Sequence, residues 1–127
     1  MRVETLAYEA DVSMVGTLYR PERDVPAPGV LVFPDIFGLG DHARERAARL
    51  AERGTVVLAA DYHGDGRILA VDPAMEELAR FYKSPDVPCR RGEAALAALA
   101  SNDTSSKPPG WKLSPRAVRL IGVPNSR

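Results

Sequence analysis

The stretch that decides the fold is Pro28-Gly-Val-Leu-Val-Phe-Pro-Asp-Ile-Phe-Gly-Leu-Gly-Asp-His42, and Val56-Val-Leu-Ala-Ala-Asp61 follows it after a helical pattern. Residues 30–33 are a continuous apolar run without alternation, which is typical of a strand covered on both faces. The second run, 56–60, ends on an acid. A strand, a helix and a second strand predict a parallel pair with a right-handed crossover. Loops at the carboxyl ends of such strands are where α/β proteins place their chemistry.

The segment between the two strands predicts an amphipathic helix, because apolar residues recur at helical spacing with charged residues between them. These apolar residues are Ala43, Ala47, Leu50 and Ala51. We expect the Asp41 side chain to cap the helix by accepting hydrogen bonds from its first backbone N–H groups. Gly54 suits the left-handed conformation that often ends a helix.

The remaining chain predicts a hairpin before these strands and two helices after them. Residues 3–9 and 13–20 are interpreted as strands joined by a turn. Pro73 is expected to open a helix that ends at Phe81, with Asp72 as its cap, and a further helix covers about 91–100. The polar run 101–110 is typical of a linker, and 118–122 predicts a last strand.

Length and composition indicate one α/β domain over residues 1–127. The 17 basic and 17 acidic residues form no basic block, which disfavours nucleic acid or a membrane surface as partner. No apolar run is long enough to span a bilayer, and the polar start does not resemble a signal peptide. The one cysteine, Cys89, excludes an internal disulfide. We therefore expect a cytoplasmic protein.

Gly38-Leu-Gly-Asp-His-Ala43, with Asp61 after the next strand, satisfies a loose dinucleotide-binding pattern. That pattern needs its first glycine directly after the strand, whereas four residues, Pro34-Asp-Ile-Phe37, intervene here. Asp41 would also repel a phosphate at the start of the helix. A glycine loop that enters a helix is the commoner interpretation.

Asp61, His63 and Asp65 alternate along the chain and could face one metal ion. Three potential ligands within one turn are weak evidence for a metal site. The ordinary interpretation is a strand end that turns at Gly64 and Gly66 and carries a solvated histidine. We therefore predict neither a metal nor a cofactor.

Cys89 is a candidate nucleophile, since the Arg90 and Arg91 side chains that follow it would favour a thiolate. No strand precedes Cys89, so no strained turn presents its thiol, and an incidental cysteine is the better interpretation. The sequence also contains no Gly-x-Ser-x-Gly motif, which would carry a serine nucleophile on a sharp turn.

Asp35 and Ile36 lie at the carboxyl end of the first predicted α/β strand. The backbone N–H of Ile36 could donate a hydrogen bond to a developing oxyanion. Asp35 taken alone is more simply interpreted as an acid that caps a turn.

At these residues the chain resembles the dienelactone hydrolase family, a branch of the α/β-hydrolases. The matching runs are Pro28 to Leu39, Arg44-Glu45, Leu50-Ala-Glu-Arg-Gly54 and Val57-Leu-Ala-Ala-Asp-Tyr-His-Gly64. The opening Gly16-Thr-Leu-Tyr-Arg-Pro21 is also similar to the family. The resemblance implies the N-terminal portion of an α/β-hydrolase fold, with an antiparallel hairpin joined to a mostly parallel sheet and flanking helices.

The resemblance also implies hydrolysis of a small-molecule carboxylic ester or lactone. Family members carry a cysteine nucleophile on Gly-x-Cys-x-Gly-Gly, with an aspartate and a histidine further on. The family's acid before Ile-Phe-Gly is usually glutamate and touches the nucleophile, whereas Asp35 is shorter by one methylene. The Ile36 N–H corresponds to half of the oxyanion hole.

The end of the sequence departs from the family pattern. The run 118–122 resembles the strand that leads to the nucleophile, yet Val123-Pro-Asn-Ser-Arg127 follows, and Pro124 stands in the place of the cysteine. A family domain is nearly twice this length. We therefore expect a truncated or frameshifted hydrolase, disrupted after about residue 101, whose central strands are left uncovered and which is inactive on its own.

An alternative hypothesis is a non-catalytic module. Such a module would bind a nucleotide at the Gly38–Ala43 loop or associate with a second copy through the open edge of its sheet.

Overall fold

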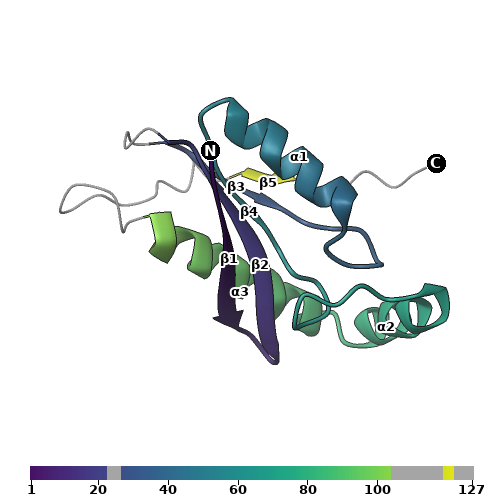
Figure 1. The fold of residues 1–127 in the computed structure, drawn as a ribbon. Coiled ribbons are helices and arrows are strands. Elements are labelled where there is room, and N and C mark those ends of the chain that lie inside the picture. The colour runs from purple at the N-terminus through teal and green to yellow at the C-terminus, as the bar shows by residue number, and fades with distance from the viewer. Residues whose placement is uncertain (23–26, 104–118, 122–127) are drawn as a thin grey trace.

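A computed structural model describes residues 1–22, 27–103 and 119–121. One mixed sheet of five strands, in the order β1-β2-β4-β3-β5, forms the centre of the molecule (Figure 1). The strands are β1 (Arg2–Glu9), β2 (Ser13–Arg20), β3 (Gly29–Val32), β4 (Val56–Ala59) and β5 (Arg119–Ile121). The helices are α1 (Asp41–Glu52), α2 (Val71–Lys83) and α3 (Asp86–Asp103).

The sheet joins an antiparallel hairpin to parallel strands, as the sequence predicts. β1 pairs antiparallel with β2 from Arg2↔Arg20 to Glu9↔Ser13, and β2 pairs antiparallel with β4. β4 pairs parallel with β3, and β3 pairs parallel with β5. The carboxyl ends of β3 and β4 therefore lie at the same edge of the sheet, and the loops that follow them meet there.

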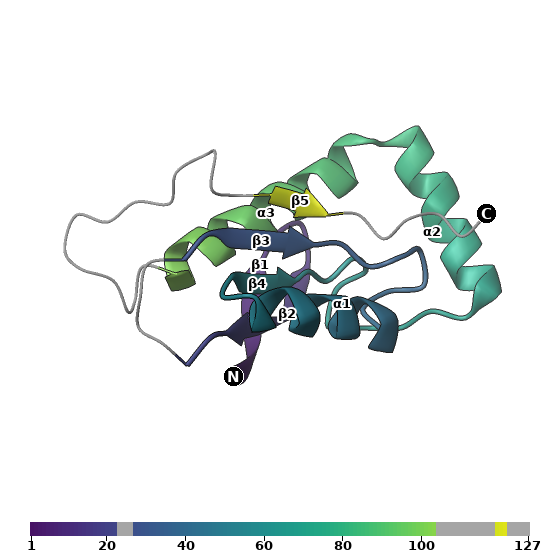
Figure 2. The same ribbon diagram turned by 90° about the horizontal axis from the view of Figure 1, so that it is seen from above.

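Helices cover both faces of the sheet: α1 lies on one side and α3 on the other (Figures 1 and 2). Alternate residues of each central strand point to opposite faces. Thus Val57 and Ala59 join the cluster under α1, whereas Leu58 joins the cluster under α3. Every residue of β3 and β4 is buried. The expectation that these two strands would be left uncovered is therefore wrong.

Neither aspartate that was expected to cap a helix does so. The N-cap of α1 is Gly40, and that of α2 is Ala70; neither helix start has a side-chain cap hydrogen bond. Asp41 lies instead in the first turn of α1, where its negative charge interacts favourably with the positive end of the helix dipole. α2 begins two residues before Pro73. Proline is tolerated at this position because it lacks a backbone N–H, and N–H groups of the first turn have no acceptor within the helix.

Other helix ends also differ in part from prediction. Gly54 has φ +96°, which confirms the left-handed residue after α1. α3 begins at Asp86 rather than at about residue 91. Its proline, Pro88, lies in the first turn, where the missing backbone N–H costs no hydrogen bond within the helix. The predicted linker is helical as far as residue 103, and the rest of it lies outside the described residues, as does the tail after Ile121.

No described helix is both long and apolar enough to cross a membrane.

Candidate functional site

The loop between β3 and α1 contains a tight turn built around Asp35. The Gly38 N–H donates to the Asp35 carbonyl oxygen (3.2 Å), and the Phe37 N–H donates to Asp35 Oδ1 (2.9 Å). An aspartate whose side chain accepts from the N–H two residues on is a common way to stabilise a turn. In this structure Asp35 therefore has the turn-capping role that its residue type suggests.

Gly38 allows this turn to lie against the loop that follows β4. Its φ of +111° is in the region that side chains other than glycine's rarely adopt. A Cβ atom added at Gly38 would lie 2.4 Å from the Arg67 carbonyl oxygen, a backbone atom that cannot move aside alone. The Leu69 N–H donates to the Phe37 carbonyl oxygen (2.8 Å) and holds the two loops together.

Ile36 lies at the tip of the turn, and its backbone N–H has no hydrogen-bond acceptor among the residues that the structure describes. The peptide plane that carries this N–H also carries the Asp35 carbonyl, which points the other way and accepts from Gly38. The direction of the Ile36 N–H is therefore fixed although the group itself is unused. The Ile36 carbonyl oxygen lies 2.5 Å from His63 Nε2.

His63 is fully buried, so the expectation of a solvated histidine is wrong. Its ring stacks on Phe81 of α2, with centroids 6.2 Å apart and planes 9° apart, and it also contacts the Tyr62 ring. Within the described ranges of the chain, His63 Nδ1 has no hydrogen-bond partner. Sequence reasoning missed the contact with Ile36, because nothing local in the sequence signals that these two residues meet.

Asp61 is a structural acid whose carboxylate is occupied by backbone donors. Oδ2 accepts from the N–H groups of Val15 (2.9 Å) and Gly66 (2.8 Å), and Oδ1 accepts from those of His63 and Gly64 (both 3.2 Å). The carboxylate thereby ties β2 to the loop after β4. Its lone pairs are committed within the protein, which argues against a ribose or metal ligand.

Tyr8 reaches the same region from the hairpin, where the Asp61 N–H donates to its hydroxyl oxygen (3.2 Å). Burial raises the pKa of Tyr8 to about 12, so the phenol stays protonated at neutral pH.

Asp61, His63 and Asp65 do not form a metal site: within the described part of the chain, no group of three such side chains could hold an ion.

Arg91 of α3 forms a bidentate ion pair near the site. Its Nε and Nη2 donate to the two carboxylate oxygens of Asp11 (both 2.9 Å), and its Nη1 donates to the Tyr62 carbonyl oxygen (2.8 Å). The hydrogen bonds from Arg91 hold the pKa of Asp11 below its usual value. The Arg91 guanidinium also lies over the Phe81 ring, 5.4 Å from its centroid. No local pattern in the sequence indicates that Arg91 is buried.

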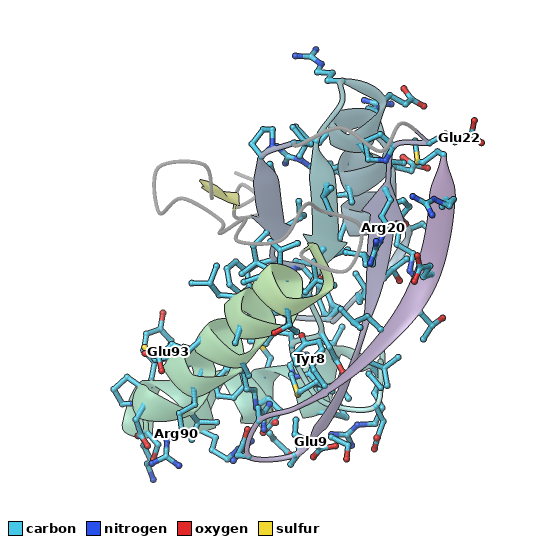
Figure 3. All side chains as sticks on the ribbon, turned by 90° about the vertical axis from the view of Figure 1, so that its left-hand side faces the viewer. Tyr8, Glu9, Arg20, Glu22, Arg90 and Glu93 are labelled. Atoms are coloured by element: carbon cyan, nitrogen blue, oxygen red, sulfur yellow. The ribbon has the colours of Figure 1, made fainter. Side chains whose placement is uncertain are left out.

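Cys89 lies on the exposed surface of α3 and not on a turn at the end of a strand. The nearby side chains of Arg90 and Glu93 also point away from the sheet (Figure 3). An exposed helical thiol has neither the strained turn nor the oxyanion donor that a hydrolytic nucleophile needs. The structure thus favours the interpretation of Cys89 as incidental.

A cavity of about 200 Å³ opens beside the turn and is lined by Asp35, Phe37, Gly38, Asp41 and Ile68 among others. Two of these residues are acids, and both are exposed. Their charges would repel the phosphates of a dinucleotide, which argues against nucleotide binding at the Gly38–Ala43 loop.

The chain matches the model of the dienelactone hydrolase family over residues 14–108. It is 33% identical to a dienelactone hydrolase-like promiscuous phosphotriesterase from metagenomic libraries (TM-score 0.81) and 35% identical to a solved protein named m3DLH (TM-score 0.72). Each match covers 95% of this chain and 48% of the other. A hypothetical protein of Pseudomonas aeruginosa shares the fold at 21% identity, with 95% of this chain and 35% of that chain covered and a TM-score of 0.61.

No curated protein matches the chain. The chain spans about half the length of the first two solved structures, and its mixed sheet with flanking helices corresponds to the N-terminal part of the α/β-hydrolase fold. A family model that covers most of the described residues, together with the turn at Asp35 and the parallel pair β3–β4, leads to one conclusion. This chain belongs to the dienelactone hydrolase family.

Proposed function

We propose that this chain supplies the oxyanion side of a dienelactone hydrolase-like enzyme that cleaves carboxylic esters or lactones. The observation that carries the proposal is the Ile36 N–H, which lies at the carboxyl end of β3 and has no acceptor among the described residues. Asp35 contributes by closing the turn that holds this group. The substrate class comes from the family to which the chain belongs.

The chemistry requires a donor whose direction is set before the reaction begins. When a nucleophile attacks an ester carbonyl, negative charge develops on the carbonyl oxygen, and a fixed N–H can stabilise it without reorganisation. One such donor is typically worth about 10²–10³ in rate. A phosphotriester also develops charge on oxygen, so the same donor suits the reaction named for the metagenomic relative.

The chain lacks the family's Gly-x-Cys-x-Gly-Gly nucleophile motif, so we propose that it does not turn over esters on its own. The direct measurement is hydrolysis of p-nitrophenyl acetate by the purified chain. We expect a rate equal to that of a Cys89→Ser variant and to the background. A rate well above background that Cys89→Ser abolishes would show that Cys89 is the nucleophile, and the proposal would then be wrong.

A chimera tests the oxyanion role. Residues 1–121 are fused to the part of the metagenomic relative that follows its matched half, and ester hydrolysis is measured. In this chimera Ile36 is replaced by its α-hydroxy acid analogue, which turns one amide into an ester and removes only the N–H. We expect kcat to fall about 10²-fold or more.

The matched control is the same replacement at Ile68, which is 65% exposed. Its backbone N–H belongs to the neighbouring loop and has no role in the proposal, so we expect kcat within about threefold of the parent. Equal losses at both positions would mean that the change acts through loop structure and not through the oxyanion.

Self-association is a second candidate, and one observation favours it. Val71, Met75 and Tyr82 lie at helical spacing on one face of α2 and are 60%, 43% and 81% exposed. Such an apolar row is costly to leave in water, and a second copy of the chain would cover it. Sedimentation equilibrium should then show a mass that rises with concentration in the parent but not in a Val71→Lys, Met75→Lys variant. A monomer at all concentrations would exclude this candidate.

A further inference from the structure

We infer that His63 is a positioning residue for the oxyanion donor: its ring fixes the backbone at Ile36 and thereby the direction of the Ile36 N–H. The effect of this positioning on catalysis rests on the proposed function. His63 itself does not touch the substrate in this role, because its side chain is fully buried behind the turn.

The contact defines the tautomer of the ring. A carbonyl oxygen can only accept a hydrogen bond, so the 2.5 Å contact with the Ile36 oxygen requires a proton on His63 Nε2. Nδ1 is buried, and among the residues that the structure describes it has no acceptor that would favour a proton there. The structure therefore assigns a proton to Nε2.

The ring has little freedom to turn away from Ile36. Phe81 stacks on it from α2, and Tyr62 packs beside it. The backbone of His63 is held as well, since its N–H donates to Asp61 Oδ1 (3.2 Å) and its carbonyl oxygen accepts from Arg67 Nη2 (2.7 Å). The donor at Nε2 is thus fixed by both its side chain and its main chain.

The hydrogen bond acts on the peptide plane that follows Ile36. That plane is held at both ends, with its carbonyl bound to His63 and its N–H bound to Asp35 Oδ1. The plane that precedes Ile36 is held through the Asp35 carbonyl by Gly38. With both planes fixed, the two backbone dihedrals of Ile36 are fixed, and so is the direction of its N–H.

Other contacts keep the turn in place when the ring's donor is removed. The Leu69 N–H still binds the Phe37 carbonyl, and Gly38 still packs on the Arg67 carbonyl. Loss of the His63 donor should therefore rotate the peptide planes around Ile36 without detaching the loop. This separates positioning of the donor from a general effect on the fold.

The first test is nitrogen NMR of the ¹⁵N-labelled full chain. We expect ring signals of His63 in which Nε2 carries the proton and Nδ1 does not. We also expect slow hydrogen exchange at Phe37 and Gly38, whose N–H groups are bonded, and faster exchange at Ile36, whose N–H is not. A proton on Nδ1 in place of Nε2 would overturn the inference.

Two variants then separate the donor from the ring. His63→Phe keeps an aromatic ring but has no donor, whereas His63→Gln places an amide N–H₂ close to the position of Nε2. We expect His63→Phe to shift the Ile36 and Phe37 amide signals and to increase Phe37 exchange at least tenfold, and His63→Gln to restore both. Unchanged Ile36 and Phe37 signals in a folded His63→Phe variant would overturn the inference.

The chimera adds a readout that a purely structural role would not change. We expect His63→Phe to lower kcat about 10-fold to 100-fold with KM within about threefold, and His63→Gln to recover most of kcat. If the parent chimera hydrolyses no ester, the proposed function has failed, and the amide signals alone decide whether His63 positions Ile36. If the chimera is active and His63→Phe leaves kcat unchanged, the positioning role is wrong while the proposed function stands.

Discussion

Arg91 and Asp11 show how a single residue pair holds distant parts of this chain together. The Arg91 side chain is only 5% exposed, and that of Asp11 is 24% exposed. The pair joins α3 to the turn of the β1–β2 hairpin, and Arg91 also binds the Tyr62 carbonyl oxygen. If Asp11 were lost, a nearly buried guanidinium would lack its bidentate partner, which is costly.

Asp11→Asn should therefore destabilise the chain by about 1.5–3 kcal/mol at pH 7, measured by urea denaturation. The hydrogen bonds from Arg91 lower the pKa of Asp11 below 3.8 in the folded chain. The stabilisation is therefore complete above about pH 4 and is lost as the pH falls through the lower, folded-state pKa. The difference between parent and variant should shrink below that pH, whereas the exposed Asp72→Asn control should show little difference throughout. A difference that stays constant down to pH 2 would contradict this account.

At the scale of an element, the turn between β3 and α1 depends on the neighbouring loop as much as on its own residues. Asp35 closes the turn through local hydrogen bonds. The approach of Gly38 to the Arg67 carbonyl and the contact of His63 with Ile36 come from the segment after β4. Two loops that follow parallel neighbours thus form one unit, and this unit presents the Ile36 N–H.

Gly38→Ala should destabilise the chain by about 1–3 kcal/mol, because the new Cβ meets the Arg67 carbonyl at a positive φ. Thermal unfolding followed by circular dichroism is the measurement. Gly40→Ser is the matched control, since its φ is −98° and a Cβ there would meet nothing within 4 Å. Serine at this N-cap should leave the stability unchanged or raise it by a few tenths of a kcal/mol, because glycine is itself a tolerated N-cap residue. An equal loss for both variants would contradict the role given to Gly38.

Across the whole molecule, β4 is the structural centre because it borders both apolar clusters. Its residues alternate between the cluster under α1 and the cluster under α3. Both clusters therefore depend on the same strand, and neither can unfold without disturbing the other. We expect the chain to unfold in one cooperative transition.

Leu58→Ala should lower the free energy of unfolding by about 2–5 kcal/mol, since Leu58 is fully buried under α3. Leu96→Ala on α3 is the control, because Leu96 is 36% exposed and should cost less than about 1 kcal/mol. Urea denaturation should give the same midpoint by far-UV circular dichroism and by tyrosine fluorescence. Two separate midpoints would show that the two clusters unfold independently.

Much of the fold could be predicted from local patterns. The apolar runs 30–33 and 56–60, the helical spacing of Ala43, Ala47 and Ala51, and the glycine at 54 are each readable within one element. Helix starts were predicted less well. Asp41 and Asp72 suit a cap by residue type, yet the N-cap of α1 is Gly40 and that of α2 is Ala70, so both aspartates lie in the first turn. Residue type sets a preference there, and the path of the preceding loop decides the outcome.

The sequence alone determined the strands, the crossover helix, the family resemblance and the turn at Asp35, because these depend on residues close together in the chain. Only the tertiary structure decided the roles of Asp61, His63 and Arg91. Asp61 binds Val15 across 46 residues, His63 meets Ile36 across 27, and Arg91 meets Asp11 across 80. Such contacts form only once the strands are ordered in the sheet, so each polar residue there is ambiguous until its distant partner is known.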